Sequence, residues 1–147
     1  MQITAKISQM DTHSISSKHT EGMAFLSSIN EHKLLTDSAT DNAVNEKGPG
    51  PKRLMLVSLA GCTGIDIVSI LEKMKVLFSD LSIDVEATLG EEHPKMYTQV
   101  TVTYKIKLEA ADRSKMEKAV QLSAEKYCGV MAMFRTFATV HTNIEYL

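Results

Sequence analysis

Alternating hydrophobic and polar residues predict strands in the second half of the chain. Every second side chain shares a face over residues 83–89 and again over 96–108. Residues 90–94, which include Gly90 and Pro94, separate the two runs and are typical of a turn. The pattern therefore predicts an antiparallel hairpin with one buried face and one face in water. A final strand of the same kind is predicted over residues 140–146.

The first half of the chain carries a weaker version of the same signal. Short alternating segments at residues 3–7, 23–29 and 33–36 predict two to four strands, with a turn at Asn30 and Glu31. Residues 37–50 are rich in Asp, Asn, Gly and Ser/Thr, which predicts a loop.

Two helices are predicted from apolar periodicity and end signals. Residues 52–76 form the first, which is apolar on nearly every side and is therefore expected at the centre of the fold. The second begins at Asp112, a good N-cap, and runs to about Tyr127, with Gly129 in the left-handed conformation that ends helices. The order of elements predicts a single α+β domain over residues 1–147, with antiparallel sheet wrapped around two helices.

Composition and charge then narrow the function classes. A chain of 147 residues with 44% hydrophobic residues can bury one core. A formal charge of -2, with no strongly basic run, argues against nucleic acid as a partner. The apolar stretch of residues 54–71 contains Asp66, and its uncharged part is shorter than the roughly 20 residues of a membrane span, so a buried helix is expected. The N-terminal residues lack the pattern of a secretory signal, so a cytoplasmic protein is expected.

The two cysteines, Cys62 and Cys128, are the candidates for chemistry. Neither belongs to a CxxC, and no Cys/His grouping has the spacing of a zinc site, so no metal and no cofactor are expected. A cysteine in an apolar helix is most often an inert small hydrophobe. However, Gly61 and Gly64 flank Cys62, and each glycine costs a helix about 0.5–1 kcal/mol relative to alanine. That cost indicates that another helix, or a small substrate, approaches closely there.

The motifs around both cysteines resemble those of a known family. The run Leu-Ala-Gly-Cys-Thr-Gly-Ile-Asp at residues 59–66, preceded by Gly-Pro-Gly-Pro at 48–51, is similar to the central-helix motif of the OsmC/Ohr family. The run Ser-Ala-Glu-Lys-Tyr-Cys at residues 123–128 resembles its second-cysteine motif. The family includes proteins of osmotic induction and of organic hydroperoxide resistance, and the resemblance spans essentially the whole chain.

The resemblance implies an intertwined homodimer, whose central helices are wrapped by sheets from both chains. It also implies an oxidoreductase of the oxidative stress response with peroxiredoxin-like activity. In that mechanism Cys62 attacks a peroxide and becomes a sulfenic acid, and Cys128 resolves it to a disulfide that an external dithiol reduces. The expected position of Cys128 at a helix C-terminus suits a resolving thiol, because the helix dipole disfavours a thiolate there.

The chain departs from the family's peroxidase branches at the group that activates the first cysteine. Those branches use an N-terminal arginine held by a glutamate, whereas this chain has no arginine in its first 52 residues and has Lys52 at the glutamate's place. Asp66 is interpreted as a buried acceptor for a hydroxyl or backbone donor rather than as a catalytic group. Other cations are candidates for the activating role: Arg135, Lys126, Lys18 and His32.

Two hypotheses for function follow. The first is a cysteine-based hydroperoxide reductase, or a related thiol redox protein, acting on a small apolar peroxide at the dimer interface. The alternative is a non-catalytic protein of the same fold that binds a small hydrophobic ligand at that interface, with both cysteines as packing. The retained cysteines favour the first, and the missing Arg/Glu pair favours the second. Candidate apolar lining residues are Met55, Met74, Met131, Met133 and Phe134.

Overall fold

The computed structural model of the chain describes residues 11–38 and 47–147. These residues form two compact units, one ending at Pro51 and the other beginning at Lys52, and each is described by itself. The strand predicted at residues 3–7 and residues 39–46 of the predicted loop lie outside the described residues. The assignment of residues 1–147 to one domain stays a prediction.

The N-terminal unit contains a three-stranded antiparallel sheet in the order β1 (Ser16–His19), β2 (Phe25–Ile29) and β3 (His32–Thr36). The hairpin of β2 and β3 confirms the alternating segments and the turn between them. Asn30 has a φ of 53°, a left-handed conformation that asparagine tolerates and that a two-residue hairpin turn needs. Strand β1 was not predicted, because its four residues are all exposed and carry no alternation.

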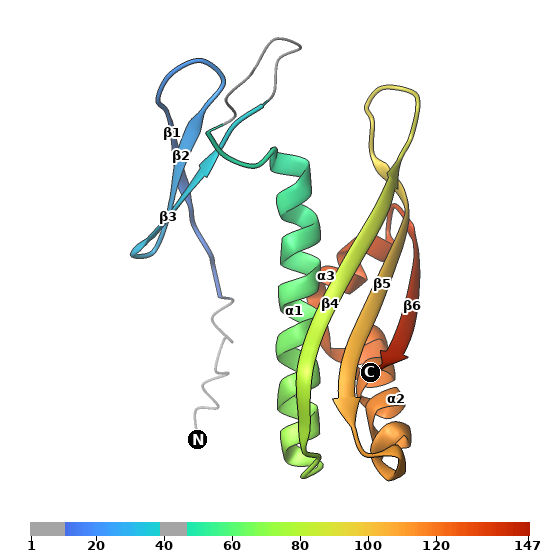
Figure 1. The fold of residues 1–147 in the computed structure, drawn as a ribbon. Helices are drawn as coiled ribbons and strands as arrows, with labels where there is room; N and C mark the ends of the chain where they lie inside the picture. Colours follow the sequence, from blue (N-terminus) through green and yellow to red (C-terminus); the bar gives the residue numbers. More distant parts are fainter. Residues whose placement is uncertain (1–10, 39–46) are drawn as a thin grey trace, which may run out of the picture. The chain divides into compact units, whose positions relative to one another are not determined.

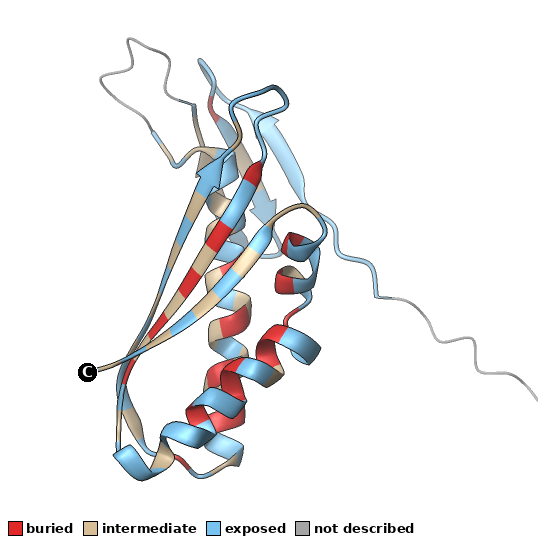
Figure 2. Cartoon of the chain, turned by 90° about the vertical axis from the view of Figure 1, so that its right-hand side faces the viewer, coloured by how far each residue is buried: buried red, intermediate tan, exposed pale blue. Residues whose placement is uncertain are grey.

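The C-terminal unit places a sheet against helices (Figure 1). The sheet has the order β4 (Phe78–Leu89), β5 (Tyr97–Leu108) and β6 (Thr139–Tyr146). Its hydrophobic core joins the inner face of β5 to the long helix α1 (Pro51–Lys73) and to the helices between β5 and β6. Figure 2 shows these buried residues along β5 and on the facing sides of the helices. The predicted α+β class is confirmed.

The hairpin of β4 and β5 confirms the clearest sequence pattern. Ile83 pairs with Tyr104, and burial alternates along β5 from Val100 to its end. At the other end a register shift gives β5 one extra residue, a β-bulge. The bulge reverses the alternation, so that Tyr97 is buried with 7% exposure while Met96 is 49% exposed. The predicted inward position of Met96 is therefore wrong.

The last strand was predicted in the right place but with the wrong direction. Strand β6 pairs with β5 in parallel, from Gln99 with Thr139 to Ile106 with Tyr146. The chain leaves the end of β5, returns through the helices and so begins β6 at the end where β5 began. The prediction of an antiparallel strand failed because alternation of residues along a strand shows which face is buried and not the direction in which the strand runs.

Helix α1 begins and ends with recognisable local signals. Pro51 is its first residue, a position where the missing N–H costs nothing. At the other end Lys75 has a φ of 56°, while Val76 N–H donates to Leu71 O and Lys75 N–H donates to Glu72 O. This is a Schellman motif with lysine in the position that usually holds glycine. The predicted helix over residues 52–76 is confirmed to within a few residues.

By length and composition alone, α1 could cross a membrane. It has 23 residues and a mean hydropathy of 2.0 in its most apolar window, of which 22% is buried. These 23 residues include the charged Lys52, Arg53, Glu72 and Lys73 at the ends of the helix, so the uncharged part to which the sequence prediction refers is shorter than the helix itself. The core helix of a folded domain passes the same test, and one side of α1, with Leu59, Ile67 and Leu71, is fully buried within the C-terminal unit.

The helix predicted over residues 112–127 is divided into several pieces. A short 3-10 turn η1 (Ala110–Asp112) precedes α2 (Arg113–Leu122), and a π-helical turn η2 (Ser123–Tyr127) follows it. Asp112 makes no capping hydrogen bond, and its carboxylate instead pairs with Lys115 at 2.7 Å. Gly129 does not end a helix in the left-handed conformation. It is the first residue of an unpredicted helix, α3 (Gly129–Arg135).

Candidate thiol site

The structure brings the two predicted cysteines together. Cys62 lies half-buried in the middle of α1, and Cys128 is 3% exposed between η2 and α3, with both thiols free. Burial, and next its interaction with the Cys62 thiol, raise the pKa of Cys128 from 9.0 to about 12. Two residues that are 66 positions apart in the chain thus pack in the same core, near enough for the Cys62 thiol to raise the pKa of Cys128.

The surroundings of Cys128 differ from the sequence expectation. Rather than standing only at the end of a helix, Cys128 is the N-cap of α3, and its Sγ accepts a hydrogen bond from Met131 N–H at 3.3 Å. That N–H lowers the pKa of the thiol, whereas burial, Cys62 and Asp66 raise it. Burial outweighs the N–H, so the thiol of Cys128 stays protonated at neutral pH.

A chain of buried hydroxyl groups lies beside the cysteines. Thr63 Oγ1 is 2.6 Å from Tyr104 Oη and 2.9 Å from Ser123 Oγ, and Ser123 Oγ donates to Asp66 Oδ2 at 2.9 Å. Each hydroxyl has one proton, and that of Ser123 goes to Asp66. Thr63 therefore donates to Ser123, and Tyr104 donates to Thr63. The result is a directed chain from the middle of β5 to the carboxylate of Asp66 on α1.

This arrangement confirms the interpretation of Asp66 as an acceptor for a hydroxyl donor. Burial raises the pKa of Tyr104, and the charges of Cys128 and Asp66 raise it further. The hydrogen bond to Thr63 and the charge of Arg135 lower it. Tyr104 therefore keeps its proton and serves as the donor that begins the chain.

Two of the four candidate cations have other partners. Arg135 Nη1 donates to the backbone carbonyl of Ala124 at 2.6 Å. Lys126 Nζ lies 5.2 Å from the centre of the Tyr127 ring, within the range of a cation–π contact. Lys18 and His32 belong to the N-terminal unit.

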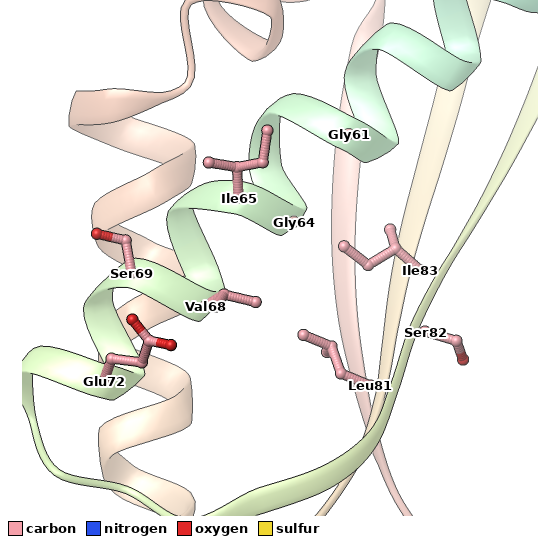
Figure 3. Close-up of a pocket in the computed structure, with 9 residues that line it drawn as sticks. All are labelled: Gly61, Gly64, Ile65, Val68, Ser69, Glu72, Leu81, Ser82 and Ile83. Atoms are coloured by element: carbon pink, nitrogen blue, oxygen red, sulfur yellow. The ribbon is translucent and has the colours of Figure 1, made fainter.

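Contrary to the expectation from the sequence, the two glycines beside Cys62 do not make room for a second helix in the part of the chain that the structure describes. A Cβ atom at Gly64 would lie 2.9 Å from Ile83 Cδ1, so this glycine lets α1 approach β4 rather than the second helix. Gly61 has no such neighbour within 4 Å among the described residues. An apolar groove of about 550 Å³ runs between α1 and β4, with Val68 pointing toward Leu81 and Ile83 (Figure 3).

The predicted apolar lining residues divide between core and surface. Met131 and Phe134 are buried in the core. Met74 borders a second cavity of about 470 Å³, which Asp66 and Tyr127 also line, and Met55 borders a small one of about 190 Å³. Met133 is 65% exposed. Over residues 11–38 and 47–147, no three His, Cys, Asp or Glu side chains are grouped as a metal site would require.

The hydroxyl chain was not foreseen from the sequence. Its members are neutral, lie 41 and 60 residues apart in the chain and form no motif. The available signal was a tyrosine on the apolar face of a strand, because a buried tyrosine hydroxyl needs a partner. Thr63 on the apolar helix was a second signal of the same kind.

Comparison with known proteins decides the family. The model of the OsmC-like protein family matches residues 44–143. The chain belongs to the OsmC/Ohr family. Protein YhfA of Escherichia coli strain K12 is 30% identical over 129 residues, which cover 87% of this chain and 93% of YhfA. Membership of the OsmC/Ohr family supports a general role in thiol redox chemistry or peroxide resistance.

Solved structures of similar proteins show the same fold. A hypothetical protein from Aquifex aeolicus VF5 is 28% identical, with a TM-score of 0.82 over 94% of this chain and 98% of that one. The organic hydroperoxide resistance protein OhrB of Bacillus subtilis has a TM-score of 0.64 at 19% identity, covering 92% of this chain and 98% of OhrB. Proteins of the OsmC/Ohr family are commonly dimeric.

Proposed function

We propose that this OsmC/Ohr protein is a cytoplasmic, cysteine-based hydroperoxide reductase in which Cys62 is the peroxidatic and Cys128 the resolving residue. The observation that carries the proposal is that Cys62 packs against the core cluster that contains Cys128, near enough for its thiol to raise the pKa of Cys128. The Cys62 thiolate attacks the outer oxygen of a hydroperoxide, and an S–O bond forms as the O–O bond breaks. The alkoxide leaves as an alcohol after taking up the proton that the thiol released. Cys128 then displaces water from the sulfenic acid to form a disulfide, which an external dithiol reduces.

Burial and acidity support this order of events. Cys128 is 3% exposed and its pKa is raised to about 12, so at neutral pH it holds almost no thiolate with which to attack a peroxide first. Cys62 is half-buried on α1 and more open to a small molecule. A protonated resolving thiol remains inert until a sulfenic acid forms next to it, which suits the second position in the sequence.

The exposed side of α1 supports a homodimer. Val57 and Ile65 are 64% and 73% exposed although both are large and apolar. The groove between α1 and β4 continues this apolar surface past Gly61 and Gly64, on either side of Cys62. A second copy of the chain would cover these residues and would close the groove into a pocket for an apolar peroxide.

The experiment treats reduced protein with one equivalent of cumene hydroperoxide and maps the products by peptide mass spectrometry. We expect an intramolecular disulfide between Cys62 and Cys128 that a dithiol reverses. We expect no peroxide consumption in Cys62→Ser, and in Cys128→Ser a single turnover with a trappable sulfenic acid on Cys62. Equal loss in both variants with no sulfenic acid would contradict the assigned roles.

The alternative function is binding of a small hydrophobic ligand with both cysteines inert. The apolar groove and the absent Arg/Glu pair favour it. The rate at which Cys62 reacts with an alkylating agent at pH 7 separates the two functions. A rate above that of free cysteine supports the reductase, because an inert packing thiol reacts more slowly. Free thiols on both residues after excess peroxide would favour ligand binding.

A further inference from the structure

The turn before Cys128 has an unusual hydrogen-bond pattern. In an α-helix the N–H of residue 128 would donate to the carbonyl of residue 124. Here Cys128 N–H donates to Ser123 O at 2.9 Å, five residues back, which makes η2 a π-helical turn. The extra residue in the turn rotates Cys128 by about 100° around the helix axis relative to an α-helical continuation. The π turn therefore contributes to the direction in which the sulfur points, together with the hydrogen bond from Met131 N–H to Cys128 Sγ.

Ser123 ties this turn to the helix that carries Cys62. Its carbonyl accepts from Cys128 N–H, and its Oγ bonds to both Thr63 Oγ1 and Asp66 Oδ2 on α1. Thr63 follows Cys62 directly, and Asp66 lies one turn further along the same helix. One fully buried residue thus connects the backbone of Cys128 to the helix segment around Cys62.

Arg135 closes the other side of the same turn. The π pattern takes Cys128 N–H away from the carbonyl of Ala124, and Arg135 Nη1 donates to that carbonyl at 2.6 Å instead. Ala124 is buried, with 8% exposure, so its carbonyl needs a donor from the protein. Removing the guanidinium would leave this carbonyl without its donor, which favours the α pattern, in which Cys128 N–H donates to it.

We propose that Ser123 and Arg135 are positioning residues that hold the π turn and thereby direct the thiol of Cys128 at Cys62. The inference rests on the proposed thiol chemistry and assigns the control of its second step. In that step the Cys128 thiol attacks the sulfur of the Cys62 sulfenic acid, and an S–S bond forms as the S–O bond breaks. The hydroxide leaves with the thiol proton as water. The Cys128 sulfur is oxidised, and the Cys62 sulfur is reduced.

The test compares Ser123→Ala and Arg135→Met with matched controls. Ser58→Ala removes an exposed hydroxyl that bonds to Leu54 O on α1, and Arg113→Met removes a guanidinium stacked 4.6 Å above the Tyr146 ring. The primary readout is the effective concentration of the thiol pair, measured at equilibrium with reduced and oxidised glutathione. Oxidised glutathione accepts the two electrons, so this readout needs no peroxide.

We expect the effective concentration to fall at least about tenfold in both test variants, the factor that a loss of about 1.4 kcal/mol in positioning gives. The controls should stay within about twofold of the wild type, and Arg135→Lys, which keeps a donor, should recover part of the loss. Sulfenic acid formation on Cys62 by cumene hydroperoxide should change less than about twofold, because it precedes the positioned step. Folded test variants with wild-type effective concentrations would overturn the inference.

Two further outcomes are separable. If the wild type forms its disulfide with oxidised glutathione but consumes no peroxide, the reductase function is wrong. The positioning role is still tested in that case by the effective concentrations of the variants. If the variants do not fold, the inference is tested by measuring amide hydrogen exchange of Cys128 in the reduced wild type. We expect the Cys128 amide to be protected like the core of β5, and rapid exchange of this amide would overturn the inference.

Discussion

Replacing Thr63 with valine tests the buried hydroxyl chain most directly. Valine has nearly the shape of threonine, so the substitution leaves no cavity and removes only the hydroxyl. Tyr104 then loses the acceptor for its proton at a site with 0% exposure, while Ser123 keeps Asp66 as its partner. The change therefore isolates the cost of an unsatisfied tyrosine hydroxyl in the core.

The magnitude follows from that unsatisfied group. A buried donor without a partner costs about 1–3 kcal/mol, and the lost bond between Thr63 and Ser123 adds about 0.5–1.5 kcal/mol. We therefore expect Thr63→Val to lower the free energy of unfolding by about 2–4 kcal/mol. Tyr104→Phe leaves no donor unsatisfied, because Thr63 still donates to Ser123, and should cost only about 1 kcal/mol. In the double variant the phenyl ring at position 104 has no hydroxyl proton to place, so the loss should be smaller than the sum of the two.

The assay is urea unfolding of reduced protein at one fixed concentration, because the midpoint of the proposed dimer would depend on concentration. Thr136→Val is the matched control, since its exposed hydroxyl bonds only to Met133 O, and it should change stability by less than about 0.5 kcal/mol. Strictly additive losses for Thr63→Val and Tyr104→Phe, or a loss below about 1 kcal/mol for Thr63→Val, would refute the directed chain.

Three other outcomes are expected. Because the folded pKa of Cys128 lies above the ordinary value of 9.0, its contribution to stability is complete below pH 9 and is lost as the pH rises toward 12. Urea unfolding of reduced protein between pH 8 and 10.5 should show a loss approaching about 1.4 kcal/mol per pH unit above 9, which Cys128→Ala lacks. Lys75→Gly should stabilise the protein to urea by about 0.5–1 kcal/mol, because glycine adopts the φ of 56° without strain, and a destabilised variant would contradict this. Ile65→Glu should shift dimer dissociation in sedimentation velocity to at least about tenfold higher concentration, whereas an unchanged equilibrium would place the interface elsewhere.

The strands that sequence predicted well are those whose burial alternates without interruption. The β4–β5 hairpin follows its pattern from Ile83 to Ala87 and from Val100 to Leu108, because burial on one face fixes which residues are apolar, whereas Leu89, which was predicted on the same face, is 43% exposed. The bulge near Thr98 was invisible, since one extra threonine among alternating residues looks like its neighbours. The parallel direction of β6 depends on the path through α2 and α3. That path could not be inferred from the sequence, because Gly129 was interpreted as the end of a helix and the seven-residue helix α3 that begins there was not predicted.

In the candidate site, too, some residues could be predicted from the sequence and others could not. The cysteines were recognised because each lies in a short run that resembles a family motif, and the acceptor role of Asp66 followed from burial of a carboxylate on an apolar helix. The partners that complete the site, Tyr104 and Arg135, come from β5 and α3 and are brought near by tertiary packing alone. The sequence offered Arg135 only as a cation near a thiol. In the structure Arg135 donates to the carbonyl of Ala124, which lacks a hydrogen bond from Cys128 N–H because of the π turn.

The parallel pairing of β5 with β6 bears on how the protein folds. The β4–β5 hairpin joins neighbours in sequence, so it closes a short loop and can form early. Strand β6 can pair only after the whole connection through α2, η2 and α3 has been ordered. Cys128 lies within that connection, so its thiol leaves water only when the connection is ordered against the core. A nascent chain would therefore expose this cysteine until α2, η2 and α3 have packed, and the finished domain would shield it.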